Sequence, residues 1–68
     1  MWDGIKRARI RMNLTQEELS EKSGVSREII ADLEEKKLET ITIDTLIRLA
    51  DALEQRVSDL FYTDSLAH

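Results

Sequence analysis

The chain of 68 residues contains no cysteine and only one histidine, His68. Without thiols it has no disulfide framework and no thiolate metal site. A single histidine is too few for a histidine-based catalytic triad or a histidine metal cluster. The sequence also lacks a glycine-rich phosphate loop, and its carboxylates are scattered along the chain. We therefore expect no enzyme activity, no metal and no cofactor.

Proline is absent and glycine occurs only twice. Both residues interrupt regular helices, so their scarcity favours a compact all-helical protein. No apolar run approaches the roughly 20 residues of a membrane span, and residues 1–14 alternate charged with apolar side chains too often for a signal peptide. The sequence predicts one soluble, cytoplasmic domain over residues 1–68, with no room for a separate domain that senses a small-molecule ligand.

The acidic excess is uneven along the chain. Ten basic against fourteen acidic residues give a formal charge of −4. Residues 1–27 carry six basic and four acidic side chains, whereas residues 28–68 carry four and ten. Because nucleic-acid-binding domains are usually basic, a DNA-facing surface on this chain has to be local. It would use the N-terminal half together with Lys36 and Lys37.

Two short helices joined by a tight turn are predicted over about residues 15–34. Thr15 and Glu18 form a capping box that opens the first of them. Gly24 ends that helix, because glycine adopts a positive φ at low cost. Ser26 then caps the second helix. Since the connection is too short for antiparallel packing, this stretch is typical of a helix-turn-helix.

Apolar residues at helical spacing predict a helix on each side of this motif. The first spans about Trp2–Met12 and ends at Asn13, which tolerates the left-handed conformation. The later helix begins between Thr42 and Asp44. Its apolar stripe consists of Ile43, Leu46, Ile47, Ala50 and Leu53.

Shorter segments complete the predicted fold. Residues 35–42 are polar and are expected to form a loop. Residues 54–56 are expected to form a turn, residues 57–61 a short fifth helix, and residues 63–68 a frayed tail. The predicted fold class is all-α, a compact five-helix bundle around one core.

With this order of helices, the sequence resembles the Cro and phage-repressor (Xre) helix-turn-helix family. The resemblance runs from about Ile5 to Phe61 and is carried by Gln16–Leu33, Ile43–Leu46, Leu49–Ala50, Ala52–Leu53 and Val57–Phe61. It implies a lambda-repressor-like bundle whose third helix lies in the DNA major groove. It also implies a sequence-specific, repressor-like regulator of transcription that acts as a homodimer on a palindromic operator in double-stranded DNA.

The resemblance assigns DNA-contacting positions on the helix-turn-helix. Gln16 matches a position that commonly contacts a phosphate or a base edge. The surface of the recognition helix is assigned to Ser26, Arg27, Glu28, Ala31 and Asp32. Arg9 and Glu34 match a pair that forms a buried salt bridge in some members and ties the first helix to the third.

Arg27 is the best candidate for reading a base, since a guanidinium can donate two hydrogen bonds to O6 and N7 of guanine. The alternative is a solvated side chain, or one paired with Glu17 or Glu28. Asp32 could accept from the N4 amino group of cytosine, but an ordinary surface acid is an equal alternative.

Lys36 and Lys37 follow the recognition helix, where their charges suit backbone phosphates. Ordinary solubilising charges are the alternative. A dimer interface could use apolar residues of the C-terminal half if they are exposed, although such a stripe is more typical of a core. These candidates are Ile47, Leu53, Val57, Leu60, Phe61 and Tyr62.

Two other functions remain open. An antitoxin-type regulator would bind both a toxin and its own promoter, but it would need a further toxin-binding surface. A protein-interaction module would keep the fold without strong DNA binding. The acidic residues Glu28, Asp32 and Glu35 and the net charge of −4 favour this second alternative.

Overall fold

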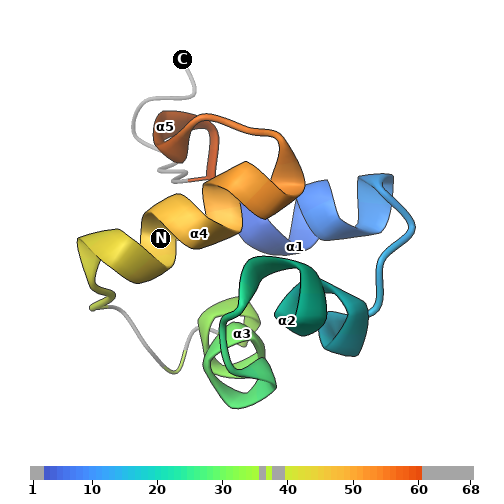
Figure 1. Ribbon diagram of the computed structural model, residues 1–68, viewed down its shortest axis with the longest axis horizontal. Coiled ribbons are helices and arrows are strands. Elements are labelled where there is room, and N and C mark those ends of the chain that lie inside the picture. The colour runs from blue at the N-terminus through green and yellow to red at the C-terminus, as the bar shows by residue number, and fades with distance from the viewer. Residues whose placement is uncertain (1–2, 36, 38–39, 61–68) are drawn as a thin grey trace.

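The computed structural model describes residues 3–35, 37 and 40–60. This part of the chain forms five helices and no strand: α1 (Asp3–Arg11), α2 (Gln16–Ser23), α3 (Arg27–Glu34), α4 (Ile43–Leu53) and α5 (Val57–Leu60). The predicted all-α fold of five short helices is therefore confirmed (Figure 1). The expectations for Trp2, Lys36, Phe61, Tyr62 and the tail 63–68 lie outside the described residues.

The predicted caps of the helix-turn-helix are present. The Oγ1 of Thr15 accepts a hydrogen bond from the backbone N–H of Glu18 at 3.0 Å, and the Glu18 carboxylate accepts from the backbone N–H of Thr15 at 2.8 Å. Gly24 ends α2 with a φ of 76°. Ser26 Oγ accepts from the backbone N–H of Glu28 at 3.1 Å and so opens α3. These bonds satisfy N–H groups that have no partner within their own helix.

Two residues other than glycine end helices in the left-handed conformation. Asn13 follows α1 with a φ of 60°, as its side chain led us to expect. Glu54 follows α4 with a φ of 57°, and its backbone N–H donates to the carbonyl of Ala50. The turn predicted for residues 54–56 is confirmed, although a glutamate adopts this conformation at some cost in strain.

Each of the five helices contributes to one core. α4 packs against α1, α2 and α5, while the α2–α3 pair and α5 lie on opposite sides of it (Figure 1). Burial of apolar surface is the main stabilising contribution in such a small protein. The side chains that are most completely enclosed are Ile5, Leu19, Ile30, Leu49, Leu53 and Leu60.

The stripe predicted for α4 is wrong at two of its positions. Ile43 is 67% exposed and Ile47 is 46% exposed. Leu49 and Ala52, which were not assigned to the stripe, are buried instead. The core-facing side of α4 is therefore turned away from Ile43 and Ile47, because α1, α2 and α5 cover the neighbouring face of the helix.

Gly4 sets the distance between α1 and α5. A Cβ atom at this position would lie 2.5 Å from the carbonyl oxygen of Asp59 and 2.7 Å from the Cα of Leu60. Both are backbone atoms, so a side chain at Gly4 would push α5 away from α1. The sequence did not predict a role for Gly4, since the contact joins residues that are far apart in the chain.

Candidate nucleic-acid interface

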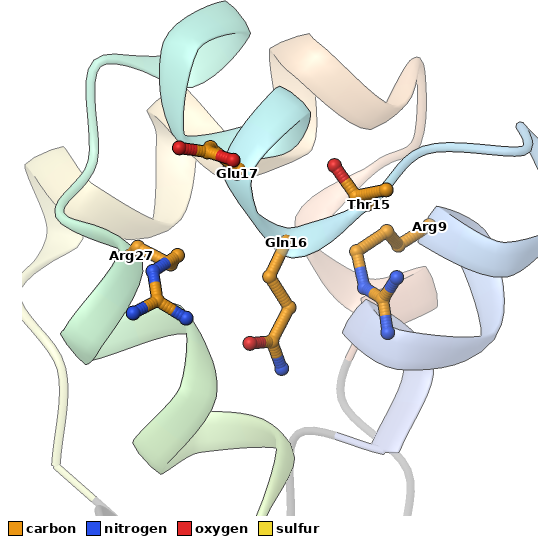
Figure 2. Close-up of a pocket in the computed structure, with 5 residues that line it drawn as sticks. All are labelled: Arg9, Thr15, Gln16, Glu17 and Arg27. Carbon is orange, nitrogen blue, oxygen red and sulfur yellow. The ribbon is translucent and has the colours of Figure 1, made fainter.

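An open hollow of about 500 Å³ lies where α2 begins. Figure 2 shows Gln16 extending from the first turn of α2 into this space, with Arg9 of α1 on one side and Arg27 of α3 on the other. Thr15 and Glu17 complete the lining. The helix-turn-helix therefore brings two of the predicted site residues, Gln16 and Arg27, to one place.

Arg9 closes one end of the hollow through the salt bridge that the resemblance implied. Its Nε lies 2.7 Å from Oε2 of Glu34, and its Nη2 lies 3.0 Å from Oε1 of the same carboxylate. A third bond joins Nη1 to the carbonyl oxygen of Leu14 at 2.7 Å. The two charged side chains are only 12% and 2% exposed. Since buried charges require partners, this geometry ties α1 to the end of α3.

Gln16 is joined to the same carboxylate. Its Nε2 donates to Oε1 of Glu34 at 3.0 Å, so this oxygen accepts from both Gln16 and Arg9. The first residue of α2 is thereby fixed to the last residue of α3. The sequence did not predict this bond, because 18 residues separate the partners and only the packing of the helices brings them together.

Arg27 is different, because it is exposed at the start of α3. Within residues 3–35, 37 and 40–60 its guanidinium has no hydrogen bond or ion pair. Arg27 therefore does not pair with Glu17 or Glu28, which was one of the alternatives. All its N–H donors are available at the edge of the hollow.

The other predicted positions on α3 are accessible to different degrees. Ser26 and Glu28 are exposed, and Ala31 and Asp32 are half-buried. The Ser26 hydroxyl is already used as a cap. The α3 surface thus presents one cation, Arg27, beside two carboxylates.

Lys37 lies beyond the C-terminal end of α3. Its Nζ is 3.2 Å from Oε1 of Glu35, and the two side chains are 68% and 57% exposed. This ion pair is open to solvent, so either partner can leave it at little cost. Lys37 and Arg27 therefore place positive charge at the two ends of α3.

A family model described as helix-turn-helix matches residues 5–60. The chain belongs to the Cro/C1-type helix-turn-helix family, which is found in phage-repressor-like (Xre) proteins. This is a family of DNA-binding regulators, not of enzymes. No curated protein and no solved structure matches the chain.

The candidates for a dimer interface of this helix-turn-helix protein separate into two groups. Leu53 and Leu60 are buried in the core, so they cannot contact a second copy. Ile47 is exposed and Val57 is half-buried. Ile43 and Ile10, which were not candidates, are also exposed. None of the described helices combines the length and the apolar composition needed to cross a bilayer.

Proposed function

We propose that this helix-turn-helix protein is a sequence-specific DNA-binding repressor that occupies an operator with α3 in the major groove. One observation carries the proposal: the Arg27 guanidinium is exposed and unpaired among the described residues, at the first position of α3. In helix-turn-helix complexes the N-terminal residues of the recognition helix contact base edges. Two parallel N–H bonds to guanine are the commonest specific contact of an arginine.

Other residues would position the protein on the sugar-phosphate backbone. The backbone N–H groups in the first turn of α2, which begins at Gln16, would attract a phosphate. Lys37, at the other end of α3, would contact a phosphate there, and Lys36 would add to its charge. Glu28 and Asp32 can accept from cytosine N4, and they disfavour positions where they would face phosphates. The net effect is a small basic footprint on an acidic protein.

A homodimer on a palindromic operator is part of this proposal. α3 has only eight residues, so one copy reaches few base pairs. Two copies related by a two-fold axis would read two half-sites about one turn of DNA apart. The exposed Ile43 and Ile47 on α4 are available to such a contact. Association of the protein with and without operator would be measured by analytical ultracentrifugation.

The function is tested by selecting bound duplexes from a random DNA pool at low salt. We expect enrichment of a palindromic site, and we expect the Arg27→Ala variant to lose or relax the preference at one position of each half-site. Affinity for the selected site should fall steeply with salt, because phosphate contacts release counterions. If the wild-type protein retains no DNA, the proposed function is wrong.

One observation favours a protein-interaction module as the second candidate. Glu28 and Asp32 lie one turn apart on α3, and Glu35 follows the last residue of that helix, so three carboxylates line its length. Such a surface suits a basic protein partner better than a phosphate backbone. A protein of this kind would show no DNA retention in the selection at any salt concentration.

A further inference from the structure

We propose that Glu34 is a positioning residue that fixes the direction of the Gln16 amide. In this arrangement Gln16 presents its carbonyl oxygen to DNA and accepts a hydrogen bond from a base amino group, adenine N6 or cytosine N4. The inference rests on the proposed function, because it concerns how the same surface reads DNA.

The direction of the amide follows from the chemistry of its partner. A carboxylate accepts hydrogen bonds, and both oxygens of Glu34 already accept from N–H groups of Arg9. The Glu34 side chain is 2% exposed, so water does not replace Gln16 as a donor there. Gln16 must therefore turn its NH₂ group toward Glu34, as the 3.0 Å bond from Nε2 shows. Its Oε1 is left on the other side, and Figure 2 shows this oxygen on the side of Arg27.

The hollow thus presents a donor group and an acceptor together. Arg27 supplies N–H donors and Gln16 supplies a carbonyl oxygen, and both line the same space. Phosphate oxygens only accept, so the Gln16 oxygen gives them no bond. Base edges in the major groove do offer both kinds of group: guanine O6 and N7 beside the N4 amino group of the paired cytosine, or adenine N7 beside N6. An edge of this kind matches the pair Arg27 and Gln16.

The competing role for Gln16 uses the second N–H of its Nε2. If that N–H donates to a phosphate, Gln16 contributes affinity without any preference for a base. A side chain that has hydrogen-bond donors but no acceptor can contact a phosphate, but it cannot accept from a base amino group. Lysine is such a side chain, and its ammonium group can still donate to Glu34.

The test compares Gln16→Lys with the wild-type protein on the selected operator and on every single base-pair substitution of it. We expect one half-site position with adenine or cytosine to lose its preference by roughly tenfold in the variant, since one base contact contributes discrimination of that order. The base at that position shows whether adenine N6 or cytosine N4 is the donor. Gln55→Lys is the matched control, because it makes the same substitution in a half-buried glutamine beyond α4 that does not line this hollow.

Glu34→Gln tests the positioning role itself. A glutamine at this position can offer its own NH₂ to the Gln16 oxygen and so allow Gln16 to reverse. We expect the same position to lose its preference although Gln16 is unchanged, whereas a merely structural role of Glu34 would weaken binding to all sequences alike. Circular dichroism would restrict the comparison to folded protein. If this variant does not fold, Gln16→Lys still decides whether Gln16 accepts from a base.

The outcomes separate the inference from the function on which it rests. A wild-type protein that selects no DNA overturns both. A wild-type protein that selects an operator, together with a Gln16→Lys variant that keeps every base preference, overturns the inference alone. Gln16 would then be a phosphate contact, and Lys would strengthen binding to all sequences.

Discussion

Arg9 and Arg27 border the same hollow and use the same chemical group in opposite ways. Arg9 is 12% exposed and donates to Glu34 and to the carbonyl of Leu14. Arg27 is exposed, and no described residue accepts from it. At the Arg9 end of the hollow the guanidinium stabilises the fold, whereas at the Arg27 end the guanidinium is available to a ligand. If α3 reads DNA as proposed, recognition uses donors and acceptors that folding leaves without a partner among the described residues.

The two arginines should therefore differ in what their loss costs. Removing one partner of a buried ion pair leaves an uncompensated charge, which is strongly destabilising. Removing a solvated side chain changes the free energy of unfolding little. The four predictions below test this division, beginning with the largest expected effect.

Arg9→Met should lower the free energy of unfolding by about 3–5 kcal/mol, because it leaves the Glu34 carboxylate buried without its main partner. A protein of this size has about 3–10 kcal/mol in total, so the variant should lose a large fraction of its stability. Urea denaturation followed by circular dichroism measures the change. A loss below about 1 kcal/mol would mean that the pair is not buried in solution.

Arg9→Met combined with Glu34→Leu should recover most of that loss. Replacing both members of a buried ion pair by apolar side chains is often nearly neutral, since no charge is left without a partner. We expect the double variant to be about 2–4 kcal/mol more stable than Arg9→Met alone, by the same denaturation experiment. If the double variant is as unstable as the single one, the hydrogen bonds that join α1 to α3 contribute the stability. The unpaired charge of Glu34 would then not explain the loss in Arg9→Met.

The sequence predicted the local features of this fold well. Capping at Thr15 and Ser26, and helix ends at Asn13 and Gly24, depend on the residue itself and on its neighbours within one turn. These signals predicted the end of α1, both ends of α2 and the start of α3, whereas α4 and α5 were predicted from apolar residues at helical spacing. The periodic pattern failed at Ile43 and Ile47, because a stripe of apolar residues does not show which helices will cover it.

The site was only partly accessible to prediction. The resemblance implied the Arg9–Glu34 salt bridge, which is present, and it assigned Arg27 to the DNA-facing surface, where the side chain is exposed. The bond between Gln16 and Glu34, and the contact of Gly4 with the backbone of α5, depend on how distant segments meet. No spacing in the sequence records such contacts, so only the three-dimensional arrangement could identify them.

Arg27→Ala should leave the free energy of unfolding within about 0.5 kcal/mol of the wild type. The substitution should instead weaken the binding free energy for the operator by about 1–3 kcal/mol. It should also relax specificity at one base pair of each half-site. Fluorescence anisotropy with the selected duplex measures the affinity. Arg27→Lys is the matched control, since it keeps the charge and loses the planar pair of donors.

If Arg27→Lys binds as tightly and as specifically as the wild type, Arg27 contributes charge alone. Arg27 would then differ from Arg9 only in being exposed, and other residues would have to read the bases. If instead Arg27→Ala also destabilises the fold by more than about 1 kcal/mol, the division between the two arginines is wrong.

Lys37→Ala extends the comparison to a cation that is exposed but paired, and its expected effect is the smallest. The Lys37–Glu35 pair is open to solvent, so the free energy of unfolding should change by less than about 1 kcal/mol. Binding should weaken slightly and equally for all DNA sequences, and the slope of log affinity against log salt should fall by about 1. Glu35→Gln, which releases Lys37 from its partner, should act in the opposite direction. If both substitutions leave the salt dependence unchanged, Lys37 is a solubilising charge, and Arg27 alone among the described residues of α3 and its C-terminal flank supplies positive charge to the interface.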